Sequence, residues 1–290
     1  MTGYQLIAVA DAPIDPTTTA ALARAVGAVA ALQPFELDGQ HGVALTCPAD
    51  APDRAGAVAL RHAVAVAAPG LDLAVRVRPL AAPALIVMDM DSTILAIEVI
   101  DELARRHGVG AEVAAVTERA MRGELDFEAS LRARVHKLAG LPARVLDELA
   151  ADLPLSPGMA PMIAALRARG VVFAIASGGF TFAAEALTAQ LGFAHAHANT
   201  LEVRAGALTG LVVGPVVTAE RKAALVAELT ARYQLTAAQV VAVGDGANDR
   251  LMLAQAGFGV AYRGKPALAA IADAAIVHGD LRRVRAFVGA

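Results

Sequence analysis

Apolar runs and amphipathic stretches alternate along the chain from residue 84 onward. The runs are short and rich in Val, Ile, Leu and Ala, which is typical of strands that are buried on both faces. Longer stretches with helical spacing lie between them, for example 159–169 and 220–233, and short antiparallel strands are expected within 194–218. The core strands are expected at 84–88, 171–176, 239–243, 257–261 and 275–277. Strands separated by helices predict an α/β fold with a doubly wound parallel sheet.

The pattern between the first two of these strands is helical, from residue 97 to about residue 152. Glycine and proline residues divide it into four expected helices, at 97–106, 111–121, 126–138 and 143–149. Because this insertion directly follows the first core strand, it predicts a helical cap over the edge of the sheet where that strand ends.

Residues 1–80 have a different order of elements. Strands are expected at 4–8, 33–37, 43–46 and 71–77, and helices at 16–31 and 51–67. The order βαββαβ is that of a ferredoxin-like sandwich. The proline-containing stretch 79–83 predicts a linker, because proline breaks helices and pairs poorly in sheets. We therefore expect two domains, at 1–80 and 84–290.

Composition narrows the class of protein. Hydrophobic residues make up 57% of the 290 residues, enough for extensive cores, and uncharged stretches such as 205–219 are too short and too rich in glycine to span a bilayer. The net charge of −3 argues against a nucleic-acid partner. The N-terminus lacks a secretory pattern, and the single cysteine, Cys47, fits a reducing compartment. A cytoplasmic protein without a membrane partner is expected.

Two carboxylates, Asp89 and Asp91, stand directly after the first core strand. Ligands bind at this end of the strands in open parallel sheets, and aspartate is costly to bury, so the pair indicates a function. One carboxylate can attack phosphorus as a nucleophile while its neighbour transfers a proton. The structural alternative is an ordinary turn, because Asp, Ser and Thr all favour turns.

Two further core strands end in polar turns, Ser177-Gly178-Gly179 and Gly244-Asp245-Gly246-Ala247-Asn248-Asp249. Parallel crossovers bring these ends to the same edge of the sheet as Asp89 and Asp91. So many carboxylates repel one another unless a cation is present, and hard oxygen ligands suit Mg²⁺. Lys222 and the amides of the Ser-Gly-Gly turn can hold phosphate oxygens. Each piece alone is also typical of a turn or a surface lysine, but together they indicate phosphoryl transfer.

These four segments resemble the motifs of the haloacid dehalogenase superfamily, and within it most closely those of the phosphoserine phosphatases, over residues 84–280. The resemblance implies that Asp89 is the nucleophile and that Asp91 is the general acid and then the base. It implies Mg²⁺ held by Asp89, Asp245 and the main-chain carbonyl of Asp91, supported by Asn248 and Asp249. It also implies that the phosphoryl group is bound by Ser177, Gly178, Gly179 and Lys222.

The cap carries two charged residues in apolar surroundings. Arg134 shares the helical stripe of Phe127, Leu131 and Leu138, which suggests an anionic ligand, although an arginine whose charged end reaches solvent fits the same pattern. Glu98 lies among apolar residues where the first cap helix begins. An arginine for a carboxylate and a glutamate for an ammonium group together suit an amino acid. The resemblance assigns these roles to the same two residues and adds substrate contacts at Met121 and Phe127.

The resulting expectation is Mg²⁺-dependent hydrolysis of O-phospho-L-serine to serine and phosphate, the last step of serine biosynthesis. One alternative is a phosphatase or phosphotransferase acting on another small phosphate ester. Another alternative is a ligand-sensing regulatory protein, because residues 1–80 resemble an ACT domain. That resemblance implies a serine or other amino-acid effector and a homodimer. Residues 1–80 are equally well explained as a plain dimerisation or folding module. Packing or surface roles are expected for His195, His197 and Cys47.

Overall fold

Strand β5 (Leu85–Met88) is buried on both faces because all four of its side chains are apolar. Leu85 and Val87 pack in one hydrophobic cluster with helix α9 (Ala219–Arg232). Ile86 and Met88 point to the other face and pack in a second cluster with helix α8 (Thr181–Leu191). Successive strand residues point to opposite faces, so this apolar run requires helices on both sides of the sheet.

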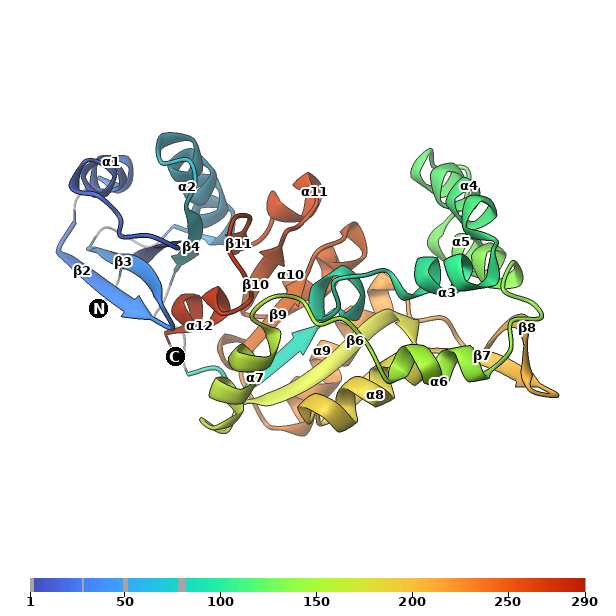
Figure 1. The fold of residues 1–290 in the computed structure, drawn as a ribbon. Coiled ribbons are helices and arrows are strands. Elements are labelled where there is room, and N and C mark those ends of the chain that lie inside the picture. The colour runs from blue at the N-terminus through green and yellow to red at the C-terminus, as the bar shows by residue number, and fades with distance from the viewer. Residues whose placement is uncertain (1–2, 28, 49–51, 78–81, 290) are drawn as a thin grey trace.

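The strands form one eleven-stranded sheet in the computed structural model, which describes residues 3–27, 29–48, 52–77 and 82–289 (Figure 1). Their order is β2-β3-β1-β4-β11-β10-β9-β5-β6-β7-β8. All neighbours from β11 to β7 are parallel, which confirms the predicted doubly wound α/β core, and β7 and β8 are antiparallel as expected. The remaining strands are β1 (Tyr4–Ala10), β2 (Ala31–Leu37), β3 (Gln40–Cys47), β4 (Asp72–Arg76), β6 (Val172–Phe180), β7 (His195–Arg204), β8 (Ala207–Val213), β9 (Val240–Gly244), β10 (Phe258–Tyr262) and β11 (Ala274–Ile276).

Helices follow the sequence pattern closely. In the cap, α4 and α5 project away from the sheet at the end opposite the N-terminal strands, whereas α6 packs against α8 (Figure 1). No helix in the described ranges is both long and apolar enough to cross a membrane. The other helices are α1 (Pro16–Val26), α2 (Arg54–Ala67), α3 (Val99–His107), α4 (Gly110–Met121), α5 (Phe127–His136), α6 (Arg144–Ala150), α7 (Met159–Arg167), α10 (Arg250–Gln255), α11 (Pro266–Ala269) and α12 (Arg283–Val288).

Two element boundaries differ clearly from the sequence prediction. Helix α1 ends at Val26 rather than near residue 31, because Gly27 caps it with a φ of 83°, a conformation that glycine adopts without strain. Strand β6 continues to Phe180 instead of ending at Ala176, and its pairing with β7 is irregular between these two residues. The Ser177-Gly178-Gly179 segment is therefore an extension of the strand rather than a separate turn.

The N-terminal elements have the predicted order βαββαβ, and their strands are arranged β2-β3-β1-β4. Helices α1 and α2 cover one face, and α12 from the end of the chain packs on the other. Strand β4 pairs antiparallel with β11, where Ala74 lies opposite Ala274. The N-terminal strands thus extend the core sheet, which the sequence pattern did not predict. Most of the expected linker, residues 79–81, lies outside the described residues.

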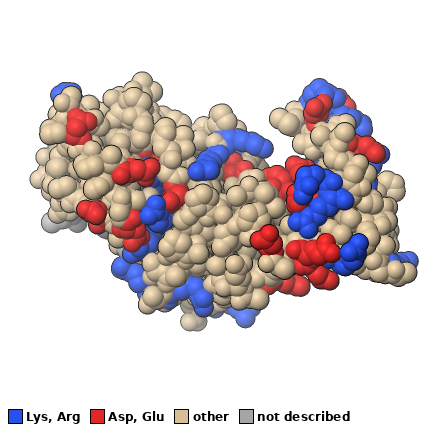
Figure 2. All heavy atoms as spheres, viewed as in Figure 1, with Lys and Arg blue, Asp and Glu red and all other residues tan. Residues whose placement is uncertain are grey.

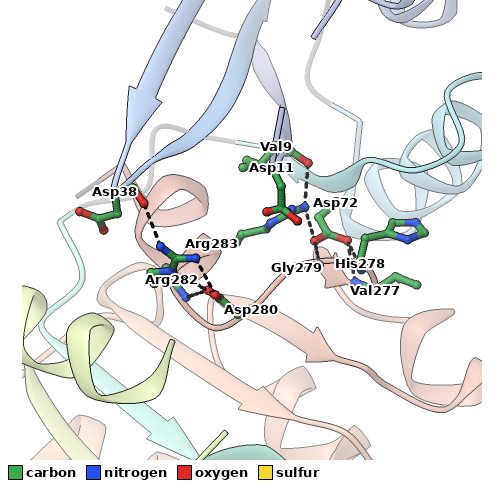
Figure 3. A network of polar contacts seen from close by, with 10 residues as sticks. All are labelled: Val9, Asp11, Asp38, Asp72, Val277, His278, Gly279, Asp280, Arg282 and Arg283. Carbon is green, nitrogen blue, oxygen red and sulfur yellow. Dashed lines mark hydrogen bonds and ion pairs between the residues drawn. The ribbon is translucent and has the colours of Figure 1, made fainter. Parts of the chain in front are cut away.

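Buried charges reinforce the junction between β4 and the core. Asp72 is fully buried and accepts hydrogen bonds from the backbone N–H groups of residues 277–279, at 2.6–2.9 Å. Arg283, only 1% exposed, pairs with Asp72 and Asp11 and donates to the carbonyl of Val9 at 2.8 Å (Figure 3). A buried carboxylate that is fully hydrogen-bonded and paired ties the two parts firmly, because separating them leaves these charges without partners.

Candidate active site

An unusual turn follows β5. The Asp89 N–H donates to the carbonyl of Val243 at 2.9 Å, which extends the sheet by one residue. The chain then turns through Met90–Ile94 and closes with a bond from the Leu95 N–H to the Met90 carbonyl, at 2.9 Å. Ser92 has a φ of 56°, a strained conformation for a residue other than glycine. Strain of this kind is typical of functional sites.

The ends of three neighbouring strands, β9, β5 and β6, border a cleft of about 780 Å³ between the sheet and the cap. The cleft is visible as a notch in the molecule, with Lys or Arg side chains on both sides (Figure 2). The expected convergence of the strand-end motifs is confirmed. Eleven of the candidate residues line it: Asp89, Asp91, Glu98, Met121, Phe127, Arg134, Ser177, Gly178, Gly179, Asp245 and Asn248.

The other two candidates, Lys222 and Asp249, are fully buried beneath this cleft. The Lys222 Nζ atom lies 2.7 Å from Asp89 Oδ2 and donates to Asp249 Oδ1 at 2.8 Å. Burial opposes the charged form of the lysine, but the two carboxylates outweigh it and raise the pKa of Lys222. Lys222 is therefore a fixed positive charge against Asp89, and a solvated surface role is excluded.

Asp249 organises the loop after β9. Its Oδ2 atom accepts hydrogen bonds from the N–H groups of Asp245 and Gly246, both at 3.1 Å. A Cβ atom at Gly244 would overlap the Asp249 carboxylate, so the strand can end against this side chain only with glycine at that position. The oxygens of Asp249 are occupied by the loop N–H groups and by Lys222, so this carboxylate holds the loop and the lysine in place.

The carboxylates at the floor of the cleft carry more negative charge than Lys222 neutralises. Burial and the neighbouring Asp89 raise the pKa of Asp245 to about 6 and that of Asp249 to about 7. Oxygen atoms of these three residues all lie within 4.8 Å of one another. Such a compact set of hard oxygen ligands, with excess negative charge, fits a divalent cation such as Mg²⁺.

Asp91 lies on the cap side of Asp89. Its Oδ1 atom accepts a hydrogen bond from the N–H of Val99 at 2.8 Å. Burial, followed by the charges of Glu98 and Asp89, raises the pKa of Asp91 well above its usual value. The carboxyl group can therefore hold a proton at a pH where an exposed aspartate is ionised, as a general acid must.

The cap contributes charged groups of both signs to the cleft. Burial lowers the pKa of Arg134, although the charges of Asp101, Glu98 and Asp91 oppose this. Among the described residues, Arg134 has a buried Nε atom that meets no hydrogen-bond acceptor. Glu98 is exposed and accepts a hydrogen bond from the Ser92 hydroxyl at 2.8 Å. Other buried side chains, such as Arg283, also have such an atom, but Arg134 lines the cleft and can donate there to an anionic ligand.

Three further residues support the site and were not predicted from the sequence. Thr93 is buried and donates to Asp245 Oδ1 at 3.4 Å. Asn199 is buried between two backbone segments, donating to the Gly178 carbonyl at 2.7 Å and accepting from the Val217 N–H at 2.8 Å. Lys265 lines the cleft, and its N–H donates to the Asp245 carbonyl at 2.9 Å. Only Thr93 had a sequence signal, its place inside the first motif.

Two of the three residues expected to have packing or surface roles, His195 and Cys47, pack against other parts of the chain. His195 is within 2.7 Å of the Tyr233 hydroxyl and packs against that ring. Cys47 is fully buried, and burial raises the pKa of its thiol, so it is not an activated nucleophile.

Comparisons with known proteins agree with this geometry. A family model described as haloacid dehalogenase-like hydrolase matches residues 83–257. The phosphoserine phosphatase of Vibrio cholerae is 52% identical over 194 residues, covering 67% of this chain and 59% of that protein. The chain spans about half to three-fifths of the length of the first curated relatives it matches.

Two solved structures match nearly the whole chain, including the N-terminal strands. The probable phosphoserine phosphatase of Vibrio cholerae, unliganded, has a TM-score of 0.80 and 38% identity, and the match covers 98% of this chain and 86% of that one. The HAD family hydrolase t0658 of Salmonella enterica serovar Typhi has a TM-score of 0.88 and 29% identity, with 98% of both chains covered. By its motifs, its fold and the family match, this chain belongs to the haloacid dehalogenase-like hydrolases.

Proposed function

We propose that this chain hydrolyses O-phospho-L-serine to L-serine and phosphate through an aspartyl-phosphate on Asp89. One observation carries the choice of substrate: Arg134 and Glu98 line the same cleft as Asp89 and Asp91. An anion-binding and a cation-binding group at one site suit the carboxylate and ammonium groups of an amino acid. The phosphoserine phosphatases among the relatives support the same substrate.

In the first step, an Asp89 oxygen attacks phosphorus in line with the serine oxygen. The phosphorus–oxygen bond to serine breaks, and Asp91 donates its proton to the departing oxygen. The raised pKa of Asp91 supports this role, because it favours the protonated form that a general acid needs. Lys222, 2.7 Å from Asp89 Oδ2, fixes the nucleophile and offsets negative charge as the phosphoryl group arrives.

In the second step, Asp91, now ionised, takes a proton from a water molecule that attacks the same phosphorus. The bond between phosphorus and the Asp89 oxygen breaks, which releases phosphate and restores both carboxyl groups. Ser177 and the glycines after it line the wall of the cleft beside Asp91. The Ser177 hydroxyl accepts a hydrogen bond from the Gly179 N–H at 2.8 Å and keeps its own hydrogen, which we propose it donates to a phosphate oxygen.

Mg²⁺ would be held by Asp89, Asp245 and the main-chain carbonyl of Asp91, with Asn248 and Asp249 holding these ligands in place. Asn248 lies within reach of the nucleophile, donating to Asp89 Oδ2 at 3.5 Å. The bound ion would neutralise charge on the phosphate oxygens.

The substrate assignment predicts that Arg134→Ala raises KM for O-phospho-L-serine by about 30-fold, because a charge-assisted contact to the carboxylate is lost. For p-nitrophenyl phosphate, which has no carboxylate, we expect less than about a threefold change by the same reasoning. Steady-state phosphate release with both esters measures this difference. Arg132→Ala on the exposed side of the same helix is the matched control, because Arg132 pairs only with Glu128 among the contacts described. Equal effects of Arg134→Ala on both esters would remove it from substrate recognition.

The close approach of Gly179 to the catalytic acid gives a second prediction. A Cβ atom there would overlap Asp91 Oδ2 and lie 2.6 Å from Met90 Cε. Gly179→Ala is expected to lower kcat by about 100-fold, because displacing a catalytic group by about 1 Å has an effect of this size. Gly110→Ala, whose new Cβ meets only Arg105 Cα at 4.0 Å, is the control. A kcat within twofold of wild type for both variants would show that Asp91 is not confined in this way.

The remaining expectations are proposals as well. We assign residues 1–80 and 84–290 to an N-terminal module and a phosphatase domain, with a serine or other amino-acid effector binding the former and a cytoplasmic location for the whole. We also propose dimerisation through the N-terminal strands, because β2 is the edge strand of the sheet that the described residues form, and an edge strand can pair with a second chain. Because β4 pairs with β11 of the core sheet, removing the N-terminal strands would expose the edge of that sheet. Effector binding should therefore be tested on the intact chain.

A further inference from the structure

Two short helices lead directly away from the acidic floor of the cleft. Helix α10 begins at Arg250, immediately after Asp249, and its buried residues Met252 and Leu253 pack against the core sheet. Helix α11 begins at Pro266, immediately after Lys265, whose N–H is bonded to the Asp245 carbonyl. The far ends of both helices point away from the cleft, and their last carbonyl groups need hydrogen-bond donors.

Arg54, the first residue of α2 in the N-terminal module, supplies these donors to α10. Its guanidinium donates to the carbonyls of Leu253, Ala254 and Ala256 at 2.8, 3.0 and 3.1 Å. It also forms a two-point pair with the Asp273 carboxylate, at 2.6 and 3.0 Å. Asp273 in turn accepts from the Gly259 N–H of β10 at 2.7 Å. One side chain therefore fixes the end of α10 to the strand beside it.

Arg61, about two turns further along α2, donates hydrogen bonds to carbonyl groups at the end of α11. Arg61 is 3% exposed, and its side chain donates to the carbonyls of Ala269, the last residue of α11, and of Ala272, the latter at 3.2 Å. A buried cation beside the carbonyl end of a helix is stabilised by that end. Helix α2 of the N-terminal module thus holds the far ends of α10, which starts at the loop carrying Asp245, and of α11, which starts next to a residue bonded to that loop.

We propose that Arg54 is a positioning residue for the metal site, acting through α10 on Asp249 and the loop that carries Asp245. Because α10 is only six residues long and packed on the sheet, movement at its Arg54 end is transmitted to Asp249. Asp249 holds both the N–H groups of that loop and Lys222. The N-terminal module is then part of the structure that shapes the active site. This inference rests on the magnesium site proposed above.

The test is Mg²⁺ binding to the full chain without substrate, measured by titration calorimetry. Arg54→Ala is expected to raise the dissociation constant for Mg²⁺ about 3- to 10-fold, somewhat less than the loss of a residue that touches a metal ligand directly. At saturating Mg²⁺, kcat and the KM for O-phospho-L-serine should return to within about twofold of wild type. Arg54→Lys keeps the charge but cannot bridge three carbonyls and a carboxylate, so it should shift the dissociation constant in the same direction. This variant provides the test if Arg54→Ala does not fold.

Arg285→Ala is the matched control. It removes another ion pair between the two parts of the chain, Arg285 with Asp38, but touches neither α10 nor α11. Weaker Mg²⁺ binding in the Arg54 variants but not in Arg285→Ala supports the proposal. Unchanged binding in the Arg54 variants, or an equal change in Arg285→Ala, overturns it while leaving the proposed function intact. Failure of the wild-type chain to bind Mg²⁺ would overturn the proposed metal site itself.

Discussion

Asp89→Asn is expected to lower phosphate release by at least about a thousandfold, because an amide cannot act as the nucleophile that forms the covalent intermediate. The substitution keeps the shape of the side chain in a buried position. Wild-type enzyme quenched in acid during turnover should carry one added phosphoryl group by intact-protein mass spectrometry, and the variant none.

Asp152→Asn, on an exposed part of the chain, is the control for the loss of one negative charge. It should leave both turnover and the phosphorylated species unchanged. Turnover of Asp89→Asn within tenfold of wild type would assign the attack to another group or to water.

Lys222→Met is expected to lower kcat by about 100-fold or more, the effect of removing one fixed electrostatic contact to the reacting groups. It should also lower the free energy of unfolding by about 3 kcal/mol in the absence of Mg²⁺, since the substitution leaves Asp89 and Asp249 buried without their cation. Steady-state kinetics and urea unfolding measure the two effects.

Lys137→Met provides the comparison for Lys222→Met. Lys137 lies on the cap and forms a partly exposed pair with Glu112, at 2.8 Å, which contributes little to stability. If Lys222→Met retained wild-type stability and kcat, the buried ion pairs would have neither role.

Most of the site could be predicted because its residues follow apolar strands. Asp89 directly follows the apolar run that forms β5, and Asp245 directly follows β9, so parallel topology brings the two motifs together. The burial of Lys222 also had a signal that spacing reveals: it shares one helical stripe with Leu225, Val226 and Leu229. Arg134 was placed at the cleft by the same kind of reasoning.

The junction between the two parts of the chain could not be predicted in this way. Arg54 bonds to Asp273, and Arg283 to Asp72, across more than 200 positions of sequence. Neither arginine interrupts a strong local pattern, and the pairing of β4 with β11 depends on how the whole sheet assembles. Local periodicity reports which face of an element is buried, but not which distant element covers it.

Phosphate release from O-phospho-L-serine, measured with Mg²⁺ and again with EDTA, is the most direct test of the proposed function. We expect rapid release with Mg²⁺, loss of release with EDTA, and a higher kcat/KM than for O-phospho-L-threonine or p-nitrophenyl phosphate. The absence of release from O-phospho-L-serine in saturating Mg²⁺, with hydrolysis of another ester, would contradict the assignment of Arg134 and Glu98 to an amino-acid substrate.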